Sequence, residues 1–248
     1  MAKLIAENKT IECKLIIFDK NGTLIDQHQV LLELAKARKK SVQKHVGEKA
    51  TEMWEKIVGV DLENEKIDHN GPLATAPRRE EVLIASAVFY LSGFPWIEAK
   101  QVAQKAYDHA DYSMKPPYGS VLLEGVKETL EQLKQRGLKL AIASTDTHRR
   151  TLESFKSLKI DSLFDEIVGS DDVAYGKPSP DMILEALRKT ESKPDEAVMV
   201  GDSLSDIQMG RNARVKACIG VLTGFTPREI LEQLADVVVS SVAELHVL

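Results

Sequence analysis

The chain contains little cysteine and no long apolar run. Cys13 and Cys218 are its two cysteines, and each lies beside an apolar run typical of a strand. A disulfide framework is therefore not expected, and a reducing cytosol fits this cysteine usage better. No apolar stretch approaches the roughly 20 residues that a membrane-spanning helix needs, and residues 1–10 lack the apolar segment of a signal peptide. We therefore expect a cytoplasmic protein that does not enter the membrane.

A strong excess of charge of either sign is also absent. The formal net charge of -5 gives no electrostatic basis for binding nucleic acid or an anionic membrane. Apolar residues make up 43% of the 248 positions, which is enough to build a buried core. This length fits one large domain, or a core that carries an insertion.

The first part of the chain changes from a strand pattern to a long helical pattern. Residues 15–18 are apolar and rich in β-branched and aromatic types, which predicts a buried strand. Helical spacing of apolar residues follows over 27–58, with an interruption at Gly47, then over 78–91, and again from Pro95 until Pro116. These patterns predict that residues 26–114 form an all-helical insertion.

Beyond residue 115, short apolar runs alternate with amphipathic stretches. Strands are predicted at 138–143, 166–169, 197–200, 217–222 and 237–239, and helices at 124–136, 149–158, 180–189 and 206–213. Such alternation is typical of an α/β fold, in which helices cover both faces of a parallel sheet. We therefore expect an α/β core formed by residues 1–25 and 115–248, with residues 26–114 inserted after its first strand.

Polar side chains come just after several of these predicted strands. In open α/β sheets, ligands bind beyond the carboxyl ends of the strands. Mg²⁺ prefers oxygen ligands, usually one or two carboxylates together with water and substrate oxygens. Asp19 and Asp202 could supply those carboxylates. The candidate site residues are Asp19, Asn21, Ser144, Thr145, Lys177, Asp202 and Asp206.

Each candidate also has a structural interpretation. The turn after Asp19 could be an ordinary strand-end turn, as could the one at Ser144. Asp202 could be the N-cap of the following helix, and Asp206 could be a first-turn acid that offsets the helix dipole. A lysine such as Lys177 is usually solvated. Their occurrence at successive strand ends favours the functional interpretation.

The motifs together resemble the haloacid dehalogenase superfamily. The quoted motifs are Asp-x-Asx-Gly-Thr-Leu at 19–24, an apolar run that ends at 144, Gly-Lys-Pro-x-Pro-Asp at 176–181 and Val-Gly-Asp-Ser-x-x-Asp at 200–206. The likeness is closest to the phosphoglycolate-phosphatase-like branch and covers residues 14–26 and 118–242. It implies a Rossmann-like parallel sheet with a helical C1-type cap inserted after the first motif.

The resemblance also implies a chemistry. The reaction would be Mg²⁺-dependent hydrolysis of a small phosphorylated metabolite through an aspartyl-phosphate. The metal would contact Asp19, the main-chain carbonyl of Asn21 and Asp202, and it would contact Asp206 either directly or through water. Ser144 and the backbone N–H of Thr145 would bind the transferring phosphoryl group, while Lys177 would balance the charge that builds on its oxygens. No nucleic acid or membrane partner is implied, and the sequence predicts neither the metabolite nor the oligomeric state.

Asn21 departs from the pattern of this family, which has an aspartate two residues after the nucleophile. That aspartate protonates the leaving alcohol and then activates water, whereas an amide exchanges no proton near neutral pH. Three explanations are open. The protein is a slow phosphatase suited to good leaving groups, or it binds a phosphorylated ligand without efficient turnover, or Asn21 is an engineered replacement in an active parent.

Substrate specificity would be set by the cap, because a cap covers the sheet edge and excludes water. Residues that could face a substrate are His69, Asn70, Arg78 and Arg79 of the insertion, and Arg149 and Arg150 of the core. Exposed basic side chains on helices are more often solvated, which is the alternative interpretation for all of them.

Overall fold

A computed structural model describes residues 2–248, which form two compact units. The first unit, called the core unit below, contains the chain up to Gln27 together with Ser120–Leu248. The second, called the helical unit, is His28–Gly119. Within the described residues, no helix is both long and apolar enough to cross a lipid bilayer.

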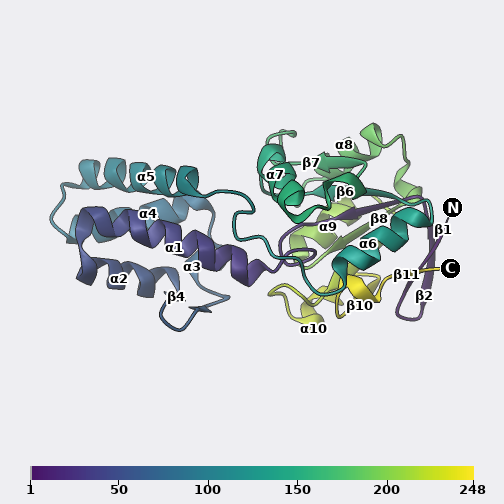
Figure 1. The fold of residues 1–248 in the computed structure, drawn as a ribbon, viewed down its shortest axis with the longest axis horizontal. Helices are drawn as coiled ribbons and strands as arrows, with labels where there is room; N and C mark the ends of the chain where they lie inside the picture. Colours follow the sequence, from purple (N-terminus) through teal and green to yellow (C-terminus); the bar gives the residue numbers. More distant parts are fainter. Residues whose placement is uncertain (1) are drawn as a thin grey trace. The chain divides into compact units, whose positions relative to one another are not determined.

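A six-stranded parallel sheet forms the centre of the core unit (Figure 1). Its order is β10 (Val237–Val239), β9 (Ala217–Val221), β8 (Ala197–Gly201), β3 (Leu15–Phe18), β6 (Lys139–Ala143) and β7 (Glu166–Val168). Every neighbouring pair in this order is parallel. The predicted α/β fold is therefore confirmed, with the first predicted strand near the middle of the sheet.

Helices cover both faces of this sheet. They are α6 (Val126–Gln135), α7 (His148–Leu158), α8 (Asp181–Lys189), α9 (Leu204–Asn212) and the short α10 (Arg228–Leu231). One face, which includes Leu15 and Ile17, packs with apolar residues of α8, α9 and α10. Ile16 and Phe18 alternate to the opposite face and are also fully buried. This burial explains why β3 consists of apolar residues throughout.

A second, antiparallel sheet in the core unit was not predicted. It contains β1 (Ala2–Ala6), β2 (Lys9–Cys13) and β11 (His246–Val247), in the order β11-β1-β2. Leu4, Ala6, Ile11 and Cys13 are buried and alternate with exposed or partly exposed positions, as a sheet with one covered face requires. Burial raises the pKa of the Cys13 thiol to about 11, and neither cysteine forms a disulfide.

The helical unit contains α1 (Gln27–Val46), α2 (Glu48–Val58), α3 (Pro72–Thr75), α4 (Arg78–Leu91) and α5 (Trp96–Ser113). Gly47 separates α1 from α2 with a φ of 74°, as its position in the sequence predicted. The expectation of an all-helical insertion is wrong at one point. The strands β4 (Val60–Asp61) and β5 (Lys66–Ile67) form a small antiparallel hairpin. Its turn is held by the Asp61 carboxylate, which accepts hydrogen bonds from Asn64.

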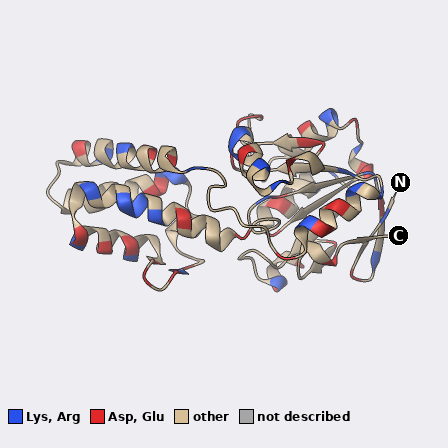
Figure 2. Ribbon diagram, in the orientation of Figure 1, with Lys and Arg blue, Asp and Glu red and all other residues tan. Residues whose placement is uncertain are grey.

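A cluster of buried polar side chains lies inside the helical unit. Arg38 and Glu81 form an ion pair, and each is 4% exposed. The guanidinium of Arg38 also lies 4.7 Å from the ring centre of Tyr107, whose hydroxyl accepts a hydrogen bond of 2.9 Å from Nε1 of Trp54. Burial raises the pKa of Glu81, although Arg38 opposes the shift. On the helix surfaces, acidic and basic residues are interspersed (Figure 2), which agrees with the small net charge.

Candidate active site

Strand register in the core unit places the predicted residues at one edge of the parallel sheet. Phe18 at the end of β3 is paired with Val200 of β8 and with Ile142 of β6. Asp19 therefore follows β3 at the level where the other two strands also end. Its backbone N–H continues the ladder by donating to the carbonyl of Val200 at 2.9 Å. Parallel strands thus bring motifs distant in sequence to a common edge.

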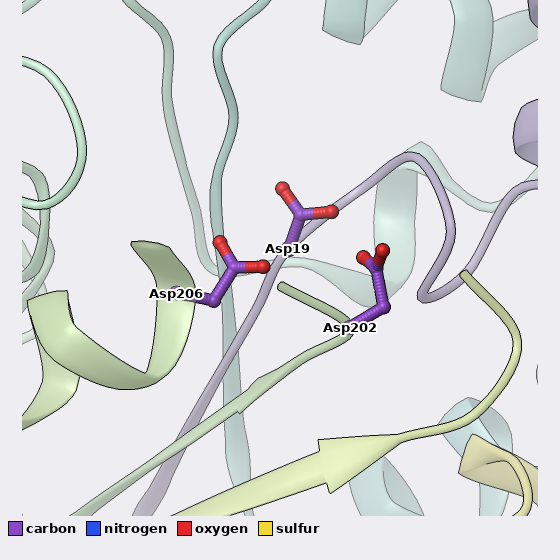
Figure 3. A group of neighbouring side chains, drawn as sticks. All are labelled: Asp19, Asp202 and Asp206. Carbon is purple, nitrogen blue, oxygen red and sulfur yellow. The ribbon is translucent and has the colours of Figure 1, made fainter. Parts of the chain in front are cut away.

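Three buried carboxylates meet at this edge. Asp19 lies just beyond β3, Asp202 just beyond β8, and Asp206 in the first turn of α9. One oxygen from each lies within 4.8 Å of the others, and the three carboxylates point into a common space (Figure 3). Asp19, the most exposed of the three, is only 7% exposed. Their convergence at one edge is what the two acidic motifs predict.

The electrostatics of this carboxylate cluster disfavour three negative charges. Burial raises the pKa of Asp19 to about 6, with Lys177 opposing the shift and Asp206 adding to it. Burial, together with the charges of Asp19 and Asp206, raises the pKa of Asp202 well above its usual value. Each shift measures how unfavourable the ionised form is in the protein. Three full negative charges are therefore unfavourable in this cluster, and Lys177 offsets only part of that cost.

Lys177 lies between two of these carboxylates. Its Nζ donates to Oδ1 of Asp19 and, at 2.6 Å, to Oδ1 of Asp206. The side chain is 4% exposed, so the interpretation of a solvated lysine is wrong. Burial would lower the pKa of Lys177, but the two carboxylates outweigh burial and raise it. Lys177 therefore carries its positive charge at the edge of the sheet.

Asp206 has a structural function in addition to this ion pair. Ser203 is the N-cap of α9, and its backbone N–H and hydroxyl both donate to Oδ2 of Asp206, at 3.0 and 2.7 Å. Asp206 is therefore an acidic residue in the first turn of α9, as one interpretation of the sequence predicted. Its second carboxylate oxygen, Oδ1, contacts Lys177. The interpretation of Asp202 as the N-cap is wrong, because Ser203 occupies that position.

Asp202 is held by residues to which the sequence interpretation gave no function. The hydroxyl of Thr23 donates to Oδ1 of Asp202 at 3.1 Å. Gly22 and Gly224 pack so closely that a Cβ on either would lie 2.5 or 1.8 Å from Oδ2 of Asp202. Thr223 fixes the arrangement by donating to the carbonyl of Gly22 at 2.6 Å. The contact between Gly224 and Asp202 could be expected from the position of Gly224 just after β9, because β9 lies next to β8 and Asp202 follows β8.

Ser144 and Thr145 follow β6 at the same edge. Ser144 is 1% exposed, and its hydroxyl accepts the backbone N–H of Asp146 at 3.1 Å, so it also has the predicted turn function. Thr145 is exposed. Both follow β6, the strand next to β3, at the edge that carries Asp19. The backbone N–H of Ser144 donates to the carbonyl of Val168 at 3.0 Å, so the hydroxyl is the group of Ser144 that could contact a ligand there.

Asn21 is part of a further polar group that the sequence did not predict. Its Oδ1 is buried without a hydrogen bond among the described residues. Lys20 is 1% exposed and contacts Oδ2 of Asp146 at 2.7 Å. Burial would raise the pKa of Asp146, but Lys20, Arg150 and Asn21 together hold it below its usual value. Lys20 and Asn21 of this group directly follow Asp19, the nucleophile candidate, in the sequence.

The basic residues considered for specificity differ in their contacts. Arg78 donates to Asp108 and Asp111, each at 2.7 Å. Arg149 pairs with Glu153 of its own helix at 3.1 Å. This contact fits the alternative interpretation, in which Arg149 lies on a solvated helix face. Arg78 and Arg149 therefore pair with acidic residues of their own units.

Comparisons with known proteins identify the family of this chain. The family described as haloacid dehalogenase-like hydrolase matches residues 16–220. The chain is 30% identical over 219 residues to a putative pyrophosphatase PpaX of Caldanaerobacter subterraneus, covering 88% of this chain and 86% of that protein. It is 35% identical over 124 residues to the pyrophosphatase PpaX of Halalkalibacterium halodurans, covering 50% of this chain and 55% of that protein.

Solved structures share the fold. A putative haloacid dehalogenase-like hydrolase from Bacteroides fragilis superposes with a TM-score of 0.64 at 22% identity, covering 94% of this chain and 99% of that one. A predicted phosphoglycolate phosphatase from Haemophilus somnus gives 0.67 at 24% identity, covering 94% and 96%. The fold agreement, the family match and the 30% identical relative confirm the resemblance read from the motifs: this chain belongs to the haloacid dehalogenase-like hydrolases.

Proposed function

We propose that this hydrolase is a phosphatase that transfers the phosphoryl group of a small phosphorylated molecule to Asp19 and then to water. The observation that carries this proposal is the position of Asp19: a buried carboxylate at the end of a central strand, in contact with Lys177 and grouped with Asp202 and Asp206. A carboxylate can act as a nucleophile toward phosphorus when neighbouring positive charge lets it approach the phosphate.

The donor set fits a hard divalent cation. The site offers carboxylate oxygens, and the raised pKa values of Asp19 and Asp202 indicate an excess of buried negative charge that a cation would relieve. Asp19, Asp202 and Asp206, with the main-chain carbonyl of Asn21, would hold Mg²⁺. When bound, Mg²⁺ would supply positive charge that neutralises carboxylate and phosphate oxygens.

The other residues would bind and orient the phosphoryl group. The ammonium of Lys177 keeps the Asp19 carboxylate in place and would attract the oxygens of the incoming phosphate. Ser144 and the backbone N–H of Thr145 would donate hydrogen bonds to the same oxygens from the adjacent strand. Such preorganised donors are worth most in a buried site with little water.

Pyrophosphate is a candidate substrate, since relatives that match this chain are named pyrophosphatases. Phosphomonoesters of small metabolites are the other class. The helical unit would act as the cap, because the chain leaves the core directly after the motif of residues 19–24 and returns at Ser120.

A second candidate function is the binding of a phosphorylated ligand with little turnover. The observation in its favour is Asn21, which gives no proton to a leaving alcohol and takes none from water. General acid–base assistance is typically worth about 10²–10⁴-fold. Binding would survive that loss, because the contact of Asn21 with a metal would use its main-chain carbonyl.

Phosphate release separates the two candidates. We expect phosphate release from pyrophosphate or p-nitrophenyl phosphate that depends on Mg²⁺, stops with EDTA and is abolished by Asp19→Asn. Asn21→Asp should increase the rate. If Asp19→Asn retains the activity and Asn21→Asp gives no gain, the phosphatase proposal fails. Saturable binding of phosphorylated compounds without turnover would instead support the second candidate.

A further inference from the structure

Lys20 is a buried basic residue that the proposed function does not use. It directly follows Asp19 in the sequence, and its side chain is 2% exposed. Its backbone carbonyl accepts the N–H groups of Leu24 and Ile25 at 2.9 and 3.0 Å, so the residue lies in a closed turn. Burying an ammonium group is unfavourable unless a partner compensates for the lost hydration. Lys20 therefore depends on the partner that its side chain contacts.

That partner is Asp146, in the loop after β6. Nζ of Lys20 lies 2.7 Å from Oδ2 of Asp146. The ion pair joins the turn after β3 to the loop after β6, and these two strands are neighbours in the parallel sheet. A buried ion pair often adds no more stability than well-packed apolar residues of similar volume. Stability of the fold alone is therefore a weak explanation for a charged pair at this position.

Asp146 in turn holds the loop that carries the two residues proposed to bind the phosphoryl group. Its backbone N–H donates to Oγ of Ser144 at 3.1 Å, and its carbonyl accepts the N–H of Ser170 at 2.9 Å. A hydroxyl that accepts one hydrogen bond still has its own hydrogen to donate. The backbone N–H of Thr145 has no acceptor among residues 2–248. The loop is thus fixed by Asp146 while one donor of Ser144 and one of Thr145 stay available.

We infer that Lys20 is a positioning residue for phosphoryl transfer. Its ion pair with Asp146 holds the loop of residues 144–146 against the turn after β3, and thereby sets where the two donors of that loop lie relative to Asp19. Lys20 contacts no reacting atom in this role. The inference rests on the proposed function, because the donors that Lys20 positions are those proposed to bind the phosphoryl group.

The place of Lys20 in the chain explains why loss of the ion pair should affect the reaction. Asp19 and Lys20 are consecutive residues of one turn, so the ion pair links the loop after β6 to the nucleophile candidate through few bonds. A displacement of about 1 Å in a binding group can lower a rate by about 10²-fold. A loop that is no longer held by Lys20 should therefore bind the phosphoryl group in a less productive position.

Replacing both members removes the ion pair without leaving a buried charge. In Lys20→Met/Asp146→Leu, called the pair variant below, one positive and one negative charge are lost together, so the net charge is unchanged. We would measure kcat/KM for p-nitrophenyl phosphate in saturating Mg²⁺, and exchange of the β3 amides would show that the core unit is folded. We expect kcat/KM to fall by about 10²-fold in the pair variant, with the β3 amides still protected.

The matched control is an ion pair at the other end of the same strand. Lys14 directly precedes β3 and pairs with Glu196, which directly precedes β8. The variant Lys14→Met/Glu196→Leu makes a similar chemical change at the amino ends of these strands, away from the candidate site. It should leave kcat/KM close to that of the unchanged protein.

The substitution Ser144→Ala separates a positioning role from a merely structural one. Once the hydroxyl is absent, the ion pair has one donor fewer to position, so the factor lost in the pair variant should shrink by about tenfold when Ser144→Ala is also present. The N–H of Thr145 accounts for the loss that remains. An ion pair that serves only folding would cost the same factor with and without the Ser144 hydroxyl.

The outcomes separate this inference from the function on which it rests. A folded pair variant that is as active as the unchanged protein overturns the inference, and so does an equal loss with and without Ser144→Ala. If the β3 amides of the pair variant exchange as in an unfolded chain, the ion pair serves folding and the inference is also overturned. In each of these cases the phosphatase proposal stands. If the unchanged protein releases no phosphate from p-nitrophenyl phosphate or pyrophosphate in Mg²⁺, the proposed function itself fails and the role of Lys20 falls with it.

Discussion

Replacing Asp19 by asparagine should stabilise the metal-free protein at neutral and alkaline pH. The pKa of Asp19 is raised from the ordinary 3.8 to about 6, chiefly by burial. In the pH range between those two values, the folded protein binds more protons at this residue than the unfolded chain does. The contribution is therefore favourable below pH 4 and is lost as the pH rises through about 6. Asparagine resembles the protonated carboxyl group and avoids that loss.

The expected size follows from the two pKa values. One pKa unit corresponds to about 1.36 kcal/mol, so the shift from 3.8 to about 6 makes the ionised carboxylate about 3 kcal/mol unfavourable above pH 7. The Asp19 side chain is 10% exposed, so solvent screens little of this cost. Asp19→Asn should thus gain about 3 kcal/mol in unfolding free energy at pH 8 and little at pH 4.

Hydrogen exchange is the appropriate assay. Both tryptophans, Trp54 and Trp96, lie in the helical unit, so tryptophan fluorescence does not report on the core unit. Exchange of the amides of β3, measured in EDTA at several pH values, follows the unfolding of the core directly. Asp195→Asn removes an exposed carboxylate of the same unit and serves as the control, with an expected change within about 0.5 kcal/mol.

Added Mg²⁺ should reduce the stability difference between Asp19→Asn and the unchanged protein. A ligand that binds only the folded state stabilises it in proportion to RT ln(1 + [L]/Kd). The unchanged protein should gain more than Asp19→Asn, which has lost one proposed ligand. A variant that is less stable than the unchanged protein at pH 8 in EDTA would refute the electrostatic reasoning. So would a gain of equal size at pH 4 and pH 8.

Two further substitutions test the support of the site and of the helical unit. Gly224→Ala places a Cβ 1.8 Å from Oδ2 of Asp202; it should weaken Mg²⁺ binding by about 10–100-fold in calorimetry. Gly137→Ala, which meets no atom within 4 Å at a φ of +82°, should leave Mg²⁺ affinity unchanged. Arg38→Met leaves the charge of Glu81 buried without its partner, and should cost the helical unit about 3–5 kcal/mol by tryptophan fluorescence. Adding Glu81→Gln should recover much of that loss; no recovery would exclude the unpaired charge as the cause.

Much of the core unit was predictable because its signals are local. β3 is apolar at every position and is followed at once by a carboxylate and an Asn-Gly turn. The alternation of strands and helices after residue 115 is enough to predict a parallel sheet, and a parallel sheet brings its strand ends together. The convergence of Asp19 and Asp202 therefore followed from topology rather than from any local property of either residue.

What escaped prediction depends on short or distant pairings. The strands β4 and β5 have two residues each, which is too short for a periodic pattern. The ion pair between Lys20 and Asp146 joins residues 126 positions apart, and one sequence carries no signal of which charges pair. The contact of Gly224 with Asp202 depends on the order of neighbouring strands, which a single sequence leaves open.

The proposed covalent intermediate is tested most directly by trapping it. Radiolabelled acetyl phosphate would be mixed with the protein in Mg²⁺, quenched in acid within the first turnovers, and the labelled peptide identified by mass spectrometry. The account predicts label on Asp19, and none on Asp19→Asn. Turnover of acetyl phosphate without any labelled protein, or label on a different residue, would contradict it.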